Sequence, residues 1–281
     1  MSRRVAITGA AGQLGRQLVR AFAESGDEVL SVARPEWDIE SEDALRRLAD
    51  WAPDVVVNSA AWTDVDGCAR DPERAMEING VAAGSVAGVA ARAGALSVQI
   101  SSNEVFDGAR DEPYTEDDDT NPINPYGASK RRGEELVLAA NPRSLVVRTV
   151  WLFGPGGVNF VTKILAASER ARDASEPLRV VDDEWGNPTW TPFLAVDIRA
   201  LVDQDVTGIV HLAGEPATSR FGWARAFLDR DVEIEPISMR EFQRASRVPP
   251  RAVLSTAKAR GIGLPSRGWE TPSLELTAGE R

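Results

Sequence analysis

The chain has 281 residues, of which 43% are hydrophobic, and this is enough to bury the core of one large domain or two smaller ones. Its formal net charge of -11 disfavours binding to DNA or RNA, and no basic run offsets that charge. No apolar stretch approaches the roughly 18 residues of a membrane-spanning helix, and the chain begins with a strand-like segment rather than a signal peptide, so we expect a cytoplasmic protein without a membrane segment.

The N-terminal segment predicts a strand, a glycine-rich turn and a helix. The apolar run at residues 4–8 leads into G-x-x-G-x-x-G, a spacing that differs from the common G-x-G-x-x-G. Gly9 permits a tight turn, Gly12 lets the backbone approach a pyrophosphate, and Gly15 lets the helix pack close to the strand. This turn therefore predicts a dinucleotide site. Its expected cofactor-binding residues are Gly9, Gly12, Gln13, Leu14 and Gly15.

The residue after the second strand bears on the choice of cofactor. Arg34 stands where an acidic residue would hold a ribose 2′-hydroxyl, and an arginine better suits a 2′-phosphate. We therefore favour NADPH, with NADH as the alternative. Asp38 lies close by in the sequence, and Asp38 with Ile39 could flank the adenine ring. The alternative is that Arg34 is only a solvated surface charge.

Strand-like and helix-like segments alternate through residue 150. We expect strands at 28–33, 54–58, 96–101 and 144–149, and helices at 42–50, 72–93 and 125–140. Repeated strand–helix units imply an α/β fold, a Rossmann-like doubly wound parallel sheet. Ligands of such sheets lie beyond the carboxyl ends of the strands. Candidate polar or glycine residues at these ends are Gly9, Asn58, Ser101, Ser102 and Thr149.

The helix expected at 125–140 carries a tyrosine and a lysine four positions apart. Tyr126 and Lys130 would therefore be neighbours on one helix face. A nearby cation lowers the pKa of a phenol, which makes Tyr126 a candidate general acid. An isolated Y-x-x-x-K is more often part of an ordinary surface helix, so this prediction depends on a cofactor and a substrate site elsewhere in the chain.

The regular alternation ends after residue 150. A glycine-rich segment at 154–157 precedes a helix expected at 159–172, and a strand at 208–212 is expected to return to the main sheet. We predict a dinucleotide-binding domain at 1–150, rejoined by about 190–214, and a mainly substrate-binding domain at 151–281. The tail from residue 271 is expected to be poorly ordered.

Cysteine and histidine are too few to predict a metal site. The single Cys68 cannot form an intrachain disulfide, and we expect it to be a small packed residue. His211, the only histidine, lies in an expected strand and is interpreted as structural.

Several short motifs together resemble an extended short-chain dehydrogenase/reductase, and more narrowly the dTDP-4-dehydrorhamnose reductase family. Each motif is weak alone, but their order and spacing are specific, and the likeness covers nearly the whole chain. The motifs are residues 9–15, 57–63, Asn79, 100–108, 113–116, 121–134, 148–151, 159–160 and 186–189. The resemblance implies reduction of the C4 ketone of a nucleotide-linked 4-keto-6-deoxy sugar by NAD(P)H.

The resemblance also implies roles for individual residues. Ser102, where the family usually has Thr, would hydrogen-bond the substrate carbonyl. Tyr126 would protonate the developing alkoxide, and Lys130 would hold the nicotinamide ribose. Further residues matched to the family are Ala60 and Ala61 along the cofactor, and Trp62, Trp151 and Asn159 on the substrate side. Trp151 is equally compatible with a core position. A homodimer is a possible assembly.

The residues after Ser102 depart from the family pattern. Asn103 and Glu104 replace the usual Asp and Tyr, so we expect both to belong to an altered sugar pocket. Glu104 would repel an anionic nucleotide sugar unless it pairs with a cation or hydrogen-bonds a sugar hydroxyl.

Two other functions fit the same motifs. A nucleotide-sugar epimerase would share the fold, the Ser, Tyr and Lys residues and tight cofactor retention. A non-catalytic NADP-binding regulatory subunit is the other alternative, because a relative of these reductases is the regulatory subunit of methionine adenosyltransferase.

Overall fold

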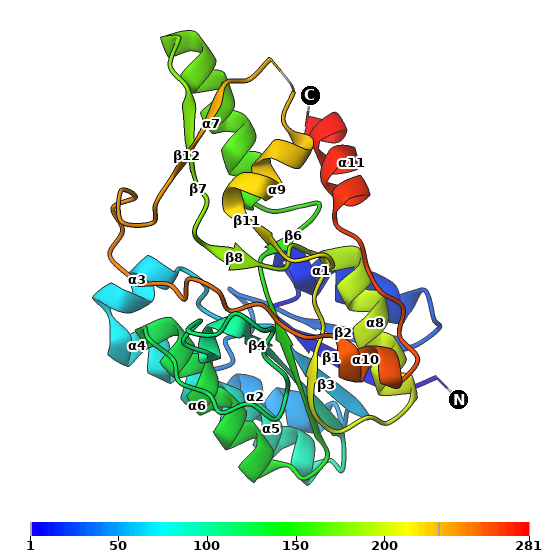
Figure 1. Ribbon diagram of the computed structural model, residues 1–281. Helices are drawn as coiled ribbons and strands as arrows, with labels where there is room; N and C mark the ends of the chain where they lie inside the picture. The colour runs from blue at the N-terminus through cyan, green and yellow to red at the C-terminus, as the bar shows by residue number, and fades with distance from the viewer. Residues whose placement is uncertain (1, 230, 281) are drawn as a thin grey trace.

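A six-stranded parallel sheet forms the centre of the structure, a computed structural model that describes residues 2–229 and 231–280 (Figure 1). Its strands are β1 (Arg4–Thr8), β2 (Glu28–Val32), β3 (Val55–Asn58), β4 (Leu96–Ser102), β5 (Ser144–Thr149) and β10 (Gly208–His211). They lie in the order β10-β5-β4-β3-β1-β2, with every neighbouring pair parallel. The expected doubly wound α/β sheet is confirmed. Its order reverses between β1 and β3, which leaves a crevice at their carboxyl ends.

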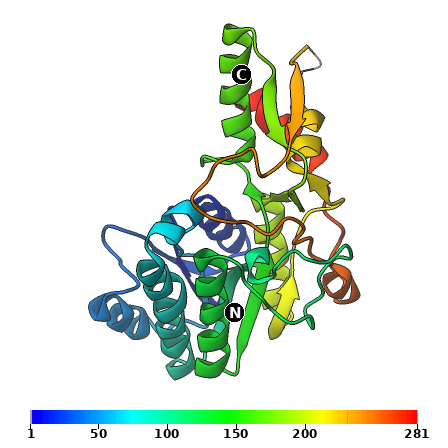
Figure 2. The same ribbon diagram turned by 60° about the vertical axis from the view of Figure 1, so that its left-hand side comes forward.

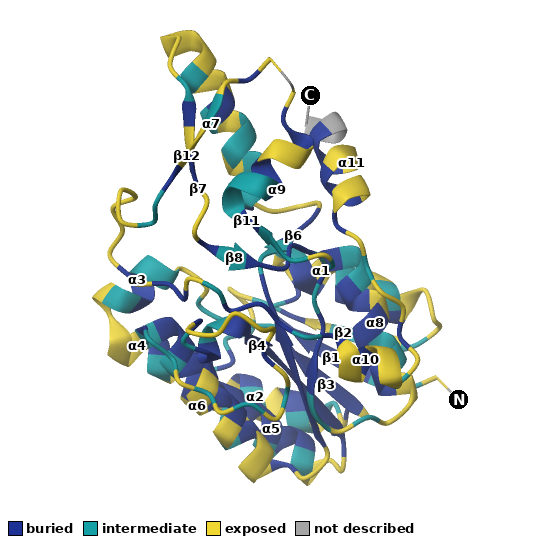
Figure 3. Ribbon diagram, viewed as in Figure 1, coloured by how far each residue is buried: buried dark blue, intermediate teal, exposed yellow. Residues whose placement is uncertain are grey.

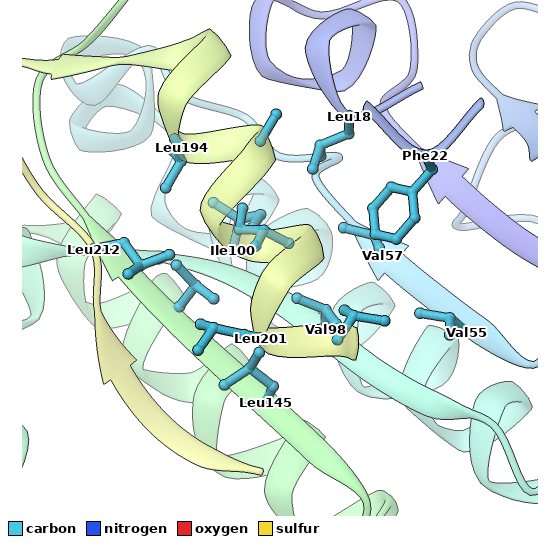
Figure 4. Packing of buried hydrophobic residues seen from close by; sticks show 14 of the residues in the cluster. Leu18, Phe22, Val55, Val57, Val98, Ile100, Leu145, Leu194, Leu201 and Leu212 are labelled. Atoms are coloured by element: carbon cyan, nitrogen blue, oxygen red, sulfur yellow. The ribbon is translucent and has the colours of Figure 1, made fainter. Parts of the chain in front are cut away.

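Helices cover both faces of the sheet, because alternate strand residues point to opposite sides. One face carries α1 (Gln13–Ala23) and α8 (Thr191–Asp203), and the other carries α2 (Glu42–Asp50), α5 (Ala82–Arg92) and α6 (Pro125–Ala140). Val5 and Ile7 of β1 share a core cluster with Phe22 of α1. Ala6, between them, packs with Val86 of α5 in a different cluster. Figure 4 shows side chains of α1 and α8 lying over those of the strands.

The long helix expected over residues 72–93 is interrupted. It consists of α4 (Pro72–Met76), the π-helical turn η1 (Glu77–Val81) and α5. Asn79 in η1 is buried, and its side chain accepts a hydrogen bond from the Trp62 N–H (2.8 Å) and donates one to the Trp62 carbonyl (3.0 Å). The wider turn thus ties this helix to the loop after β3, a contact that hydrophobic spacing does not reveal.

A second, smaller core lies apart from the sheet, at the top of Figure 1 and Figure 2. At its centre Trp223 is fully buried and stacks on Phe160, with ring centroids 4.6 Å apart. Its main elements are α7 (Phe160–Ala174), β7 (Leu178–Val181), α9 (Arg220–Phe227), β12 (Ile234–Ile237) and α11 (Glu270–Glu280). Shorter elements are α3 (Val65–Arg70), η2 (Asn103–Val105), β6 (Leu152–Phe153), β8 (Trp185–Gly186), β9 (Thr189–Trp190), β11 (Thr218–Ser219) and α10 (Ala257–Gly261).

The structure of the C-terminal tail differs from the expectation. Residues 270–280 form α11 instead of a poorly ordered segment. Trp223 Nε1–H donates a hydrogen bond to Ser273 Oγ at 3.1 Å, and both Ser273 and Thr277 are fully buried. The helix therefore completes the second core.

The central sheet is more buried than the helices of the second core. In Figure 3 the central strands are buried, whereas the outer parts of α7 and α9 carry exposed residues. Among the described residues, no helix combines the length and apolar character needed to cross a membrane.

Candidate active site

A cavity of about 510 Å³ opens at the sheet's reversal point, beyond the carboxyl ends of β1, β2 and β3. Its volume is within the range of ordinary ligand pockets. The expected residues that line it are Gly9, Gly12, Arg34, Ile39, Ala60, Ala61 and Trp62. Trp37, Arg74 and Ile78 also line it, although no sequence motif indicates them.

The glycine turn forms one wall of this cavity. Gly9 has a φ of 65°, and a Cβ there would lie 2.7 Å from the Ala60 backbone nitrogen. A Cβ on Gly15 would lie 2.1 Å from the Gly9 carbonyl oxygen, so only glycine permits this strand–helix contact. Gly12 is the N-cap of α1 and lines the cavity, which puts the positive end of the helix dipole beside it. These features fit the pyrophosphate of a dinucleotide.

Three expected cofactor residues do not line the cavity and contact other parts of the chain. Gln13 Nε2 donates to the Gly154 carbonyl at 2.7 Å, which ties α1 to the glycine-rich segment 154–157. Leu14 is buried in the main core. Asp38 forms an ion pair with Arg34, Nε to Oδ2 at 3.1 Å. Their role toward a cofactor stays a prediction.

Ser102, Tyr126 and Lys130 come together as expected. Ser102 ends β4, Tyr126 lies in the first turn of α6, and Lys130 follows one turn later. Ser102 lies close enough to the Tyr126 hydroxyl to act on its pKa, and Ser102 Oγ donates to Asn103 Oδ1 at 3.3 Å. Lys130 Nζ donates to the Ile100 carbonyl at 2.6 Å, and both Tyr126 and Lys130 are buried.

The electrostatics of this group differ from the expectation. Burial, together with the Glu104 carboxylate, holds the pKa of Tyr126 above its ordinary value, while Ser102 opposes this. Burial lowers the pKa of Lys130 to about 8, against the attraction of Glu134. The expected lowering of the Tyr126 pKa by Lys130 is therefore wrong for this structure, because desolvation disfavours both charged forms.

The start of α6 is positioned by local sequence. Asn124 is the N-cap, and its Oδ1 accepts a hydrogen bond from the Gly127 N–H at 2.7 Å. Pro125 occupies the first turn, where its missing N–H costs nothing. A Cβ on Gly127 would lie 2.0 Å from the Glu104 carbonyl oxygen, so glycine allows α6 to pack on η2 beside Tyr126.

A buried ion pair under the site was also missed. Arg148 of β5 donates to both oxygens of Glu134 of α6, at 2.9 and 2.8 Å, and Ser101 Oγ donates to Glu134 at 2.5 Å. All three side chains are buried. This network fixes the orientation of α6 on β4 and β5, and hence of Tyr126. It joins three distant segments, so no local pattern signals it.

Glu104 lies near Tyr126 and is itself surrounded by charged groups. Asn124 Nδ2 donates to Glu104 Oε2 at 2.6 Å. Burial raises the pKa of Glu104 to about 7, the Glu184 charge adds to the increase, and the Asn124 hydrogen bond and the Arg244 and Arg220 charges oppose it. Glu104 can therefore change charge near neutral pH.

Trp151 lies beside this charged group. It has a φ of 46°, its ring stacks on Trp223 with centroids 6.0 Å apart, and the Arg220 guanidinium lies 3.6 Å from its ring centroid. A Cβ on Gly186 would lie 2.8 Å from the indole, which explains a glycine in the 186–189 motif. Arg220 is held by Glu184, Nη2 to Oε1 at 2.9 Å.

Asn103 and Asn159 hold the chain in place. Asn103 is buried, and its Nδ2 donates to the Ala252 carbonyl at 3.0 Å. Asn159 caps α7: its Oδ1 accepts from the N–H groups of residues 161 and 162, and its Nδ2 donates to the Gly154 carbonyl at 3.1 Å. In this structure the polar atoms of Asn159 are bonded to the chain, and Asn103 Nδ2 is bonded to the Ala252 carbonyl. A contact of Asn103 or Asn159 with the substrate stays a prediction.

Known proteins resemble this chain over nearly its full length. A dTDP-4-dehydrorhamnose reductase of Mycolicibacterium smegmatis is 40% identical over 279 residues, which cover 96% of this chain and 83% of the relative. A spore coat polysaccharide biosynthesis protein of Bacillus subtilis is 36% identical over 270 residues, covering 95% and 94%. A crystal structure of a Bacillus anthracis dTDP-4-dehydrorhamnose reductase in complex with NADP is 32% identical, has a TM-score of 0.91 and covers 100% of both chains.

The sequence pattern of one family spans both cores of the structure. It is described as the RmlD substrate binding domain and matches residues 3–278. The chain belongs to this family.

Proposed function

We propose that this protein uses NADPH to reduce the C4 ketone of a nucleotide-linked 4-keto-6-deoxy sugar, with NADH as a second possible cofactor. The observation that carries the proposal is the meeting of Ser102, Tyr126 and Lys130 at the carboxyl edge of a sheet with a dinucleotide-sized cavity. Relatives named as dTDP-4-dehydrorhamnose reductases, one of them solved with NADP, support the choice of substrate and cofactor. The single cysteine fits a reducing compartment and so supports a cytoplasmic location.

The proposed chemistry divides between cofactor and protein. The nicotinamide supplies the hydride. The Ser102 hydroxyl donates a hydrogen bond to the ketone oxygen, and Tyr126 donates the proton that neutralises the developing alkoxide. The Tyr126 hydroxyl is protonated at neutral pH, as a proton donor must be, since the ordinary pKa of a phenol is about 10 and burial raises it further. Lys130 is fixed one helical turn away, where it would hold the nicotinamide ribose.

The remaining predicted contacts complete this proposal. Ala60 and Ala61 would lie along the cofactor and Trp62 on the side of the sugar, and all three line the cavity. Trp151 and Glu104 would face the sugar nucleotide, and the Arg220 and Arg244 charges near Glu104 would offset the nucleotide's negative charge.

The test is NADPH oxidation by the purified protein with a panel of dTDP-, UDP- and GDP-linked 4-keto-6-deoxy sugars. We expect oxidation with at least one of them and a product that carries a C4 hydroxyl. Absence of oxidation, with stoichiometric NAD retained through purification, would favour the epimerase. Absence of oxidation with a partner enzyme that co-purifies would favour a regulatory subunit.

A further inference from the structure

A second arginine lies at the same end of the cofactor cavity as Arg34. Arg74, in α4, lines the cavity together with Arg34, although the two are forty positions apart in the chain. Both bind Glu40: Arg34 Nη2 lies 2.6 Å from Glu40 Oε2, and Arg74 Nη2 lies 2.7 Å from the same oxygen. Arg74 Nη1 also donates to Glu40 Oε1. We call Arg34, Glu40 and Arg74 the Glu40 cluster.

The two arginines of the cluster line the cavity, and Glu40 lies between them. The Glu40 side chain is 18% exposed, whereas those of Arg34 and Arg74 are 56% and 44% exposed. The Arg74 backbone N–H is capped by Asp71 Oδ1 at 3.0 Å, which fixes the start of α4. Each guanidinium therefore retains a surface that a ligand can reach.

Neighbouring residues identify this end of the cavity as the adenosine end. Trp37 and Ile39 line the cavity together with Arg34, and all three follow β2, the edge strand that lies three places from β4 and its Ser102. The Arg47 guanidinium lies over the Trp37 ring, 4.1 Å from its centroid. A flat aromatic and a buried aliphatic side chain suit an adenine ring. The Glu40 cluster would then lie beside the adenosine ribose.

The charges of the cluster make it sensitive to a ribose phosphate. Arg34 and Arg74 converge on Glu40, Arg34 also pairs with Asp38 at 3.1 Å, and guanidinium groups bind phosphate oxygens with the same geometry. A phosphate monoester that carries a charge of about -1.5 to -2 would compete with Glu40 for both arginines. A ribose that carries hydroxyls instead would find in Glu40 a carboxylate acceptor, the group that binds a 2′-hydroxyl in NAD-dependent folds.

We propose that the Glu40 cluster recognises the adenosine ribose in two alternative ways. Arg74 joins Arg34 in binding the 2′-phosphate of NADPH, while Glu40 accepts hydrogen bonds from the ribose hydroxyls of NADH. Arg74 is therefore a specificity residue for NADPH, and Glu40 sets how strongly NADPH is preferred. The inference rests on the proposed use of a nicotinamide dinucleotide, but not on the identity of the sugar.

Equilibrium binding without any sugar tests the inference separately from the reaction. Affinities for NADPH, NADH and adenosine 2′,5′-bisphosphate would be measured by calorimetry for the wild type and the variants Arg74→Met and Glu40→Gln. Arg70→Met is the matched control, because Arg70 is an exposed arginine of α3 that pairs with Asp64.

Arg74→Met is expected to weaken NADPH and the bisphosphate by roughly tenfold to a hundredfold, and to change NADH by less than about twofold. Glu40→Gln is expected to raise the ratio of NADPH to NADH affinity by about tenfold, since it removes a competing carboxylate. Equal weakening of both cofactors by Arg74→Met, or an unchanged ratio in Glu40→Gln, would overturn the inference. A wild type that binds neither nucleotide would overturn it and the proposed cofactor together.

Discussion

At the scale of single residues, Glu104 separates this chain most clearly from the family pattern. Its carboxyl has a pKa of about 7, because burial opposes ionisation more than Asn124 and the nearby arginines favour it. Above that pH the group is anionic beside the proposed site of an anionic nucleotide sugar. Below it the neutral acid can donate a hydrogen bond. The departure noticed in the sequence thus corresponds to a titratable group close to Tyr126.

This titration predicts a pH-dependent KM. As the pH rises through about 7, we expect the KM for the nucleotide sugar to rise roughly fivefold, the equivalent of about 1 kcal/mol of repulsion. Glu104→Gln stays neutral, so its KM should change little over the same range. The KM for NADPH, measured in parallel, is the control. An identical pH dependence of the sugar KM in both proteins would exclude this role for Glu104.

The titration of His211 affects the stability of the fold and not the binding of substrate. It is fully buried, and burial, reinforced by the Arg148 charge, lowers its pKa to about 3. The unfolded chain takes up a proton below about pH 6.5, whereas the folded protein does not, so stability is lost as the pH falls. Between about pH 6.5 and 5 the loss should be roughly 2 kcal/mol.

Urea unfolding at these two pH values checks the contribution of His211. The wild type is compared with His211→Gln, which cannot titrate but retains the same carboxylates. The variant should be less stable at neutral pH and should lose about 2 kcal/mol less on acidification. Since His211 is the only histidine, an equal loss in both proteins would refute the assignment.

At the scale of elements, most of the sheet and its helices could be predicted from hydrophobic period and glycine positions. The expected segments 42–50 and 144–149 coincide with α2 and β5. The π-turn η1 could not be predicted, because it depends on a contact between Asn79 and a loop seventeen residues earlier. For the same reason the Glu134–Arg148 pair and α11 were missed: their partners lie far away in the sequence.

The close contact between α6 and η2 gives a prediction at this scale. Gly127→Ala would push a Cβ onto the Glu104 carbonyl and shift the start of α6, so we expect a loss of roughly 1–3 kcal/mol in stability and a marked fall in kcat. Gly88→Ala in α5 is the control, since its Cβ meets only Arg92 Nη1 at 3.6 Å. That change should stabilise the protein by about 0.5–1 kcal/mol and leave kcat unchanged. Denaturant unfolding and steady-state rates measure both; equal effects of the two changes would contradict the packing argument.

At the scale of the whole molecule, the segment 246–252, which follows β12 of the second core, contacts the helix that carries Tyr126 and its neighbours. Ser246 N–H donates to Asp66 Oδ1 at 2.8 Å, and the Arg247 carbonyl accepts from Asn124 Nδ2 at 2.7 Å. Further on, the Ala252 carbonyl accepts from Asn103. This segment, orange in Figure 1, runs past α3 and the start of α6. We propose that it couples a dinucleotide-binding domain at 1–150 and about 190–214 to a substrate-binding domain formed mainly by 151–281.

Part of the candidate site could be predicted from the sequence. The sequence placed Ser102, Tyr126 and Lys130 correctly relative to the strands, since the carboxyl ends of parallel strands share one edge. It could not indicate Arg74, Arg220 or Glu184, whose position depends on how distant segments pack.

The central claim is that Tyr126 protonates a C4 oxygen while the nicotinamide delivers its hydride to C4. The most direct measurement is the transfer of deuterium from NADPH labelled at nicotinamide C4 into a dTDP-4-keto-6-deoxy sugar. Tyr126→Phe is compared with Tyr114→Phe, which removes the hydroxyl of the only other tyrosine, bound to Asp107. We expect deuterium at sugar C4 with the wild type and Tyr114→Phe, and a rate lower by about a hundredfold or more with Tyr126→Phe, which should still bind NADPH. Deuterium at another position, or an unchanged rate in Tyr126→Phe, would contradict the claim.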